Sequence, residues 1–194
     1  MGKKIVLGGI VAGIVVFIWS AVSHMVLGLG EAGIKGLPNE DAVLSVLSTN
    51  VTEPGFYFFP WTDERGSKEA MDAWKEKYRT SPAGIMIYKP QGGEMMPPSM
   101  LITELLTNIL AALIAAFLLS KAVGNLGGML GKAVFVSLFG LFAGVEIDLS
   151  YWNWYGFPTS YTLSYIVQHV IGWFLAGLVL GFFFKKPAAS QPAM

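Results

Sequence analysis

The chain has 194 residues, of which 54% are hydrophobic and 13% are charged, and its mean hydropathy is +0.56. This composition is too apolar for an ordinary soluble domain and is typical of a small polytopic membrane protein. The sequence has no cysteine, which excludes disulfides and thiol chemistry, and its formal net charge of +0 includes no basic cluster suited to nucleic acid.

Four apolar runs are candidate transmembrane helices, at residues 5–29, 100–119, 133–145 with its flanks, and 161–184. A helix needs about 20 apolar residues to cross the hydrocarbon of a bilayer, and three of the runs reach that length. The third run is the least secure, because glycines interrupt it and it ends at Glu146. We therefore expect an all-α membrane protein built as a four-transmembrane-helix bundle.

The long segment between the first two runs contains signals for a small α/β cap. Asn39 precedes two acids and an apolar stretch, which predicts an N-capped helix to about residue 50. Ser67 is placed to cap a second helix, at residues 68–79. Aromatic and β-branched residues at 56–59 and 84–88 predict two short strands.

The charges predict how the chain crosses the membrane. Six lysines and no acid flank one set of helix ends, whereas all thirteen acids lie between the first two runs or near the opposite helix ends. The positive-inside rule then places both termini and the 120–132 connection in the cytoplasm. We expect a first transmembrane helix in residues 1–30, an extracytoplasmic cap in 31–97, and helices two to four with a cytoplasmic tail in 98–194. This topology fits a bacterial inner membrane. The six lysines are Lys3, Lys4, Lys121, Lys132, Lys185 and Lys186.

Ionisable side chains near the outer ends of the runs predict a polar pocket. A rise of about 1.5 Å per residue from the flanking lysines places them in the outer third of a core about 30 Å thick. Such groups are costly in hydrocarbon, so we expect them to face the bundle interior together with polar residues of the same helical phase. The pocket is predicted to contain Glu104, Asn108, Asp148, Tyr165, Gln168 and His169.

Glu146 and Asp148 cannot both face that interior. They are two residues apart, which is roughly 200° around a helix. Asp148 shares its phase with Gly140 and Gly144, which favours Asp148 inside and Glu146 towards a partner. Unwinding of the helix after Gly144 would reverse that assignment.

A bound metal is an alternative use of the same residues. Imidazole and carboxylate groups suit zinc, iron or manganese, so His24, Glu104 and His169 are candidate ligands. No spacing typical of di-iron bundles or haem attachment is present, and haem held by the two histidines is the remaining option. The expectation for cofactors is therefore none, with metal or haem as the alternative.

The sequence favours a noncatalytic accessory or interaction protein, which docks a partner protein, a second copy or a lipid through its outer face. It contains no Gly-x-Ser-x-Gly elbow and no P-loop. The alternative is a membrane enzyme or cofactor-binding protein with a metal or proton-handling site in the outer leaflet. A binder of a small molecule or lipid that performs no chemistry is a third possibility.

Overall fold

The structure is a computed structural model that describes residues 1–185; Lys186 and the rest of the C-terminal tail lie outside the described residues. The chain divides into two compact units. The helical unit comprises residues 1–34, 96–152 and 157–185, and the inserted unit comprises residues 35–95 and 153–156.

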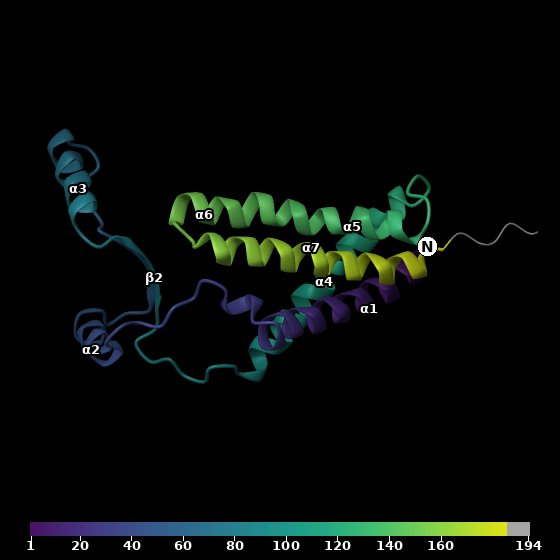
Figure 1. Cartoon of the computed structure of the whole chain (residues 1–194), viewed down its shortest axis with the longest axis horizontal. Helices are drawn as coiled ribbons and strands as arrows, with labels where there is room; N and C mark the ends of the chain where they lie inside the picture. The colour runs from purple at the N-terminus through teal and green to yellow at the C-terminus, as the bar shows by residue number, and fades with distance from the viewer. Residues whose placement is uncertain (186–194) are drawn as a thin grey trace, which may run out of the picture. The chain divides into compact units, whose positions relative to one another are not determined.

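The helical unit contains four helices that are long and apolar enough to cross a membrane, as the hydropathy predicts (Figure 1). Their length and composition identify the chain as an integral membrane protein. The spans are α1 (Gly2–Ala21) with the π-helical turn η1 (Val22–Val26), α4 (Pro98–Ala122), α5 (Met129–Ala143) with the π-helical turn η3 (Gly144–Asp148) and α6 (Leu149–Tyr155), and α7 (Thr159–Phe183).

The third span does not end at Glu146, and that expectation was wrong. Its helix continues through η3 and α6 to Tyr155. A π turn accommodates an extra residue without ending the helix, and the first proline after it is Pro158. The glycines that make the run look interrupted pack against α7 instead: a Cβ at Gly140 would overlap the His169 carbonyl, and one at Gly144 would overlap Ile166.

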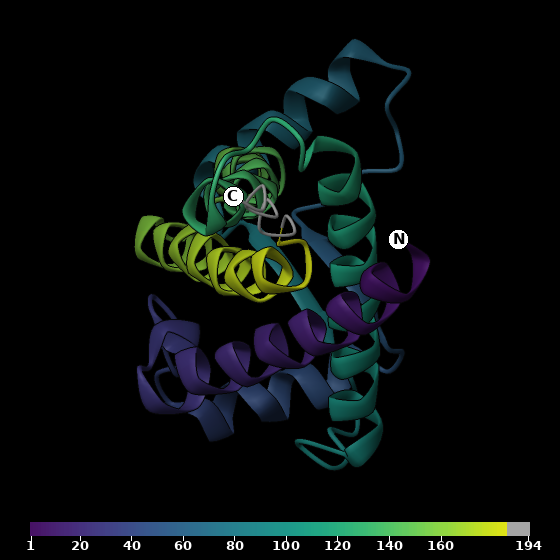
Figure 2. The same cartoon turned by 90° about the vertical axis from the view of Figure 1, so that its right-hand side faces the viewer.

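The helices pack in pairs through small residues. α1 packs along α4 and α7, and α5 packs along α7. Figure 2 shows α4 running steeply across α1, while α5 and α7 lie side by side. A Cβ at Gly13 would overlap the backbone of Ile109 on α4, and a Cβ at Gly177 would overlap Ala133 on α5. Close backbone approach of this kind drives helix association where lipid removes the hydrophobic driving force.

This packing is tight at one end of the helical unit and loose at the other. All buried residues of α4 lie in its second half, from Ala112 to Ser120, whereas none is buried between residues 98 and 111. We call the tight end the lysine end, because it holds Lys121 and Lys132. There the side chain of Lys132 is buried and donates a hydrogen bond to the carbonyl oxygen of Phe184 at 3.0 Å, beyond the end of α7. α4 makes few contacts with α7 along its whole length and packs mainly on α1.

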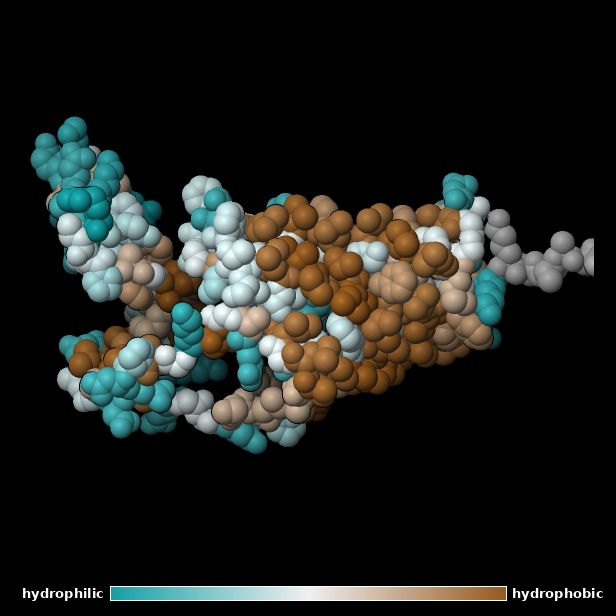
Figure 3. All heavy atoms as spheres, viewed as in Figure 1, coloured by the Kyte–Doolittle hydropathy of each residue, from teal (hydrophilic) through white to brown (hydrophobic). Residues whose placement is uncertain are grey.

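Hydrophobic side chains cover the outside of these helices. On the face shown in Figure 3 they form a continuous band over the helical unit, with hydrophilic side chains at its ends. Many are large and exposed, such as Leu110 on α4, Phe142 on α5 and Phe182 on α7. A band of this kind is expected where lipid tails replace water as the surrounding medium.

The inserted unit contains the two helices and two strands that the sequence predicts. α2 (Glu40–Asn50) and α3 (Lys68–Thr80) accompany the antiparallel strands β1 (Gly55–Phe59) and β2 (Gly84–Tyr88), in which Tyr57 pairs with Met86.

The two helix starts in this unit differ in how they are capped. The Ser67 hydroxyl accepts a hydrogen bond from the Ala70 amide at 3.1 Å, as predicted for α3. Asn39 occupies the N-cap of α2 in a left-handed conformation and makes no side-chain cap, so that detail of the prediction was wrong. Neither helix has a buried residue, and Phe58 of β1 stacks on Tyr78 of α3 with ring centroids 6.1 Å apart.

Candidate functional site

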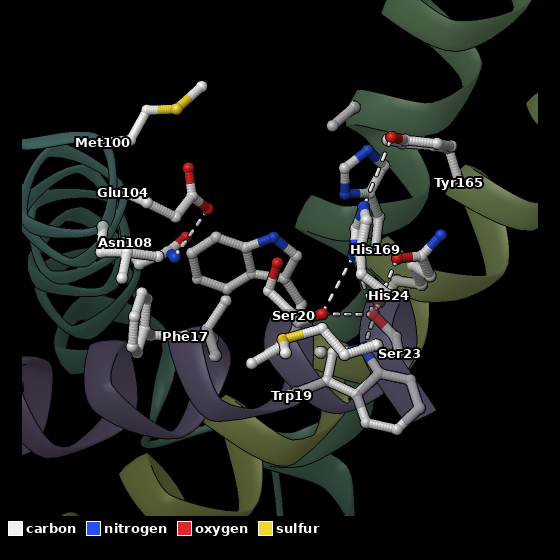
Figure 4. A pocket seen from close by; sticks show the side chains of 18 of the residues that line it. Phe17, Trp19, Ser20, Ser23, His24, Met100, Glu104, Asn108, Tyr165 and His169 are labelled. Atoms are coloured by element: carbon white, nitrogen blue, oxygen red, sulfur yellow. Dashed lines mark hydrogen bonds between the residues drawn. The ribbon is translucent and has the colours of Figure 1, made fainter. Parts of the chain in front are cut away.

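A cavity of about 660 Å³ lies between the helices at the loose end of the helical unit. Its lining comes from α1, η1, α4, α5 and α7, with Met96 just before α4 (Figure 4). Most of the lining is apolar, including Phe17, Met100, Leu101 and Trp173. The volume is within the range of about 300–1,000 Å³ in which proteins hold small ligands.

One wall of the cavity carries His24 and Tyr165 in contact. His24 Nδ1 lies 2.9 Å from the carbonyl oxygen of Ser20, and Nε2 lies 3.4 Å from the Tyr165 hydroxyl. A carbonyl can only accept, so Nδ1 carries a proton, and in the neutral ring Nε2 accepts from the tyrosine. The two rings meet edge to face, with centroids 5.8 Å apart. The Ser23 hydroxyl lies 3.3 Å from Nδ1 as well, so His24 is held by three partners and is half-buried.

His169 lies on the same wall, one helical turn from Tyr165, and is backed by an acid. Its Nε2 is 3.3 Å from Oδ2 of Asp148, whose side chain is 13% exposed. That oxygen makes no hydrogen bond to any residue within 1–185, so the histidine is its close polar neighbour. The other ring nitrogen, Nδ1, makes no hydrogen bond to the described residues and is available to a ligand.

A buried amide fixes this wall in place. Gln168 is 5% exposed, and its Oε1 accepts from the Ser23 hydroxyl at 2.8 Å. The backbone carbonyl of Gln168 accepts from the indole N–H of Trp19 at 2.9 Å. Both bonds join the end of α1 to α7, and they position His24 beside Tyr165.

The facing wall is formed by α4 and carries acceptors. Asn108 donates from Nδ2 to Glu104 Oε1 at 2.9 Å, which leaves Oε2 of the carboxylate and the amide oxygen of Asn108 uncommitted. No cation among the described residues forms an ion pair with Glu104. Figure 4 shows Glu104 and Asn108 on one side of the cavity and His24, Tyr165 and His169 on the other.

Two π-helical turns carry ionisable residues at the first wall or directly behind it. His24 lies in η1 and Asp148 lies in η3. Turns of this kind are rare and are frequent at functional sites, because the inserted residue changes the direction of nearby side chains. No periodicity in the sequence predicted either turn.

Most of the predicted site residues line the cavity, but Asp148 and Glu146 do not. Asp148 does not line the cavity but lies behind His169, and Glu146 is exposed and lies outside the cavity. The predicted residues that line the cavity are Glu104, Asn108, Tyr165, Gln168, His169 and His24.

Several lining residues were missed by sequence reasoning. None of these residues carries a charge, so their residue types did not distinguish them from ordinary core or lipid-facing positions. They are Trp19, Ser23, Met100 and Trp173. The i, i+3, i+4 spacing of Ser20, Ser23 and His24 is the one signal that pointed to a shared polar face.

The candidate metal site is not assembled. Within residues 1–185 no three His, Cys, Asp or Glu side chains are grouped so that they could hold a metal ion. The physical reason is the divergence of α4, which places Glu104 across the cavity from His24 and His169. These three residues therefore line one cavity without forming one coordination sphere.

Comparisons with protein-family models, curated proteins and solved structures gave no match to this chain. The site is accordingly interpreted from its own chemistry.

Proposed function

We propose that this chain is a noncatalytic integral membrane protein that holds an amphipathic lipid in the cavity at the loose end of the helical unit. The observation that carries the proposal is the cavity itself, which combines an apolar lining with polar groups on two facing walls. A ligand that fits such a lining has an apolar body and a polar head.

The packing of the helices supports entry from the bilayer. α4 is attached to the rest of the unit mainly through α1, and its first half buries no residue. Its contact with α7 is not extensive, so the cavity between them is not closed by a tight helix–helix seam. A lipid can enter sideways through such a gap without passing through water, and its chains remain among apolar side chains throughout.

Two features of the architecture belong to this proposal. The four helices form a bundle whose lysine end faces the cytoplasm of a bacterium, in its inner membrane, with the inserted unit outside as a cap. The exposed carboxylate of Glu146 is then available to a protein partner or a second copy, outside the cavity.

Native mass spectrometry of the protein released from bilayer nanodiscs tests lipid binding. We expect one retained phospholipid per chain. Ser20→Phe would place a ring inside the cavity, since Ser20 lines it, whereas Val22→Phe in the adjoining turn η1 is a matched control because Val22 is exposed and does not line it. Loss of the lipid in Ser20→Phe alone supports the proposal. Absence of retained lipid in the native protein, or equal retention in both variants, contradicts it.

One observation favours a second candidate, a proton-handling or cofactor-dependent membrane enzyme. The His169–Asp148 pair resembles the arrangement in which a carboxylate orients an imidazole for proton transfer, and it lies beside a tyrosine and a second histidine. Elemental analysis and an absorption spectrum of gently purified protein distinguish the two candidates. A stoichiometric metal or a haem band that disappears in His169→Ala would favour this candidate over lipid binding.

A further inference from the structure

The two walls of the cavity are chemically opposite, and this difference identifies the head group of the bound lipid. We infer that the cavity selects a zwitterionic phospholipid with a primary ammonium, which binds Glu104 and Asn108, and a phosphate, which faces His169. This inference rests on the proposed function and specifies its ligand class.

The α4 wall offers acceptors without a bound donor. One oxygen of Glu104 accepts from Asn108, while its second oxygen and the Asn108 amide oxygen have no hydrogen bond from the described residues. No lysine or arginine within residues 1–185 lines the cavity. The Glu104 side chain is exposed, and where lipid surrounds it in place of water its carboxylate is stabilised by a cation that also donates hydrogen bonds. A primary ammonium has three donors and no acceptor, so it matches this wall.

The facing wall offers donors. Asp148 lies beside Nε2 of His169, and Nδ1 of the same ring makes no hydrogen bond to the described residues, so it can donate to a ligand when it carries the ring proton. The indole N–H of Trp173, which also lines the cavity, makes no hydrogen bond within the described chain. Phosphate oxygens are strong acceptors, so they match these two N–H groups.

The same residues disfavour other common head groups. An anionic glycerol head group places negative charge beside Glu104, and the described lining has no lysine or arginine to compensate it. A quaternary choline head group keeps the positive charge but has no N–H to donate to the free carboxylate oxygen. Progressive methylation of the amine therefore tests this contact directly, because each step removes one donor while the charge remains.

The experiment is a competition among phospholipids for the protein in nanodiscs, read by native mass spectrometry. The series contains ethanolamine, N-methyl, N,N-dimethyl and choline head groups on identical acyl chains, together with a glycerol head group. We expect retention to fall along the series, by about tenfold or more from ethanolamine to choline. Soluble phosphoethanolamine is a separate arm, and equal occupancy by it would identify a water-soluble ligand and overturn the inference.

Three variants test which wall of the cavity is responsible for the head-group preference. Glu104→Gln keeps a hydrogen-bonding side chain beside Asn108 and should abolish the preference for the primary amine while lipid is still retained. His169→Ala should weaken retention of all the phospholipids in the series alike. Glu146→Gln removes an exposed carboxylate outside the cavity and should change neither result.

The possible outcomes distinguish failure of the head-group inference from failure of lipid binding itself. If lipids are retained without regard to the head group, or Glu104→Gln keeps the preference, the inference about the head group is wrong and lipid binding stands. If no lipid is retained, both are wrong. Circular dichroism and the SDS unfolding midpoint of each variant show whether it is folded, and Glu104→Asp provides a second, charge-conserving variant if Glu104→Gln does not fold.

Discussion

Replacing Gly13 with alanine should separate α1 from α4 and destabilise the protein. A Cβ at this position would overlap the Cα and N atoms of Ile109. Backbone atoms cannot rotate aside, so the helices must move apart, and overpacking of this kind costs about 1–3 kcal/mol. Alanine recovers up to about 1 kcal/mol through its better helix propensity. We therefore expect a net loss of about 1–2 kcal/mol, which is roughly a 5- to 30-fold change in the unfolding equilibrium.

Two other glycines of α1 provide matched comparisons. A Cβ added at Gly2 would have no neighbouring atom within 4 Å, so Gly2→Ala should be neutral or slightly stabilising. A Cβ at Gly8 would meet side-chain atoms of Leu180 and Phe183 at 3.2–3.4 Å, which can shift, so Gly8→Ala should have an intermediate effect. Reversible unfolding in SDS, followed by tryptophan fluorescence and circular dichroism, gives the order of stability of the three variants. Equal stability of Gly13→Ala and Gly2→Ala would refute the close contact.

Three further predictions concern single residues elsewhere. Lys132→Met removes the buried donor to the carbonyl oxygen of Phe184, just beyond α7. We expect faster amide hydrogen exchange in the last turn of α7 and an unfolding free energy lower by about 1 kcal/mol. Ser67→Ala should destabilise α3 by about 0.5–2 kcal/mol, seen as faster amide exchange in its first turn than in its last. Hydrogen bonds from Lys68 and Lys75 lower the pKa of Asp72. These two pairs therefore stabilise α3 fully at pH values above the ordinary aspartate pKa of about 3.9. Their contribution is lost as the pH falls through the lowered pKa of Asp72. An NMR titration of its carboxyl group should give a midpoint below that value, and high salt should move the midpoint back up because the pairs are exposed.

Hydropathy and local capping signals were sufficient to place most elements. The four spans follow from apolar length alone, since lipid requires a continuous hydrogen-bonded helix wherever the chain crosses. The start of α3 follows from Ser67, whose cap depends on neighbours three residues away. Such features are local, and a single sequence contains the information that determines them.

The direction in which Asp148 points was predicted only in part. Its helical phase with Gly140 and Gly144 favoured the bundle interior, but it did not show that Asp148 lies behind His169 instead of lining the cavity. Gly140 and Gly144 determine that position by approaching His169 and Ile166 closely, because they have no side chains. The π turn at Gly144–Asp148 then changes the phase locally, and no residue pattern predicts its position.

The distribution of small residues also explains why a cavity forms where it does. On α4 the alanines at 111, 112, 115 and 116 all lie in the half nearer the lysine end, and this half packs closely. The other half carries Glu104, Asn108 and bulky apolar residues, and none of its residues is buried. Replacing the exposed Glu104 with an apolar residue would favour stability alone, because an unpaired carboxylate in contact with lipid is costly. Such an acid is stabilised when a cation from outside the chain binds beside it, and we propose the primary ammonium of a bilayer lipid as that cation.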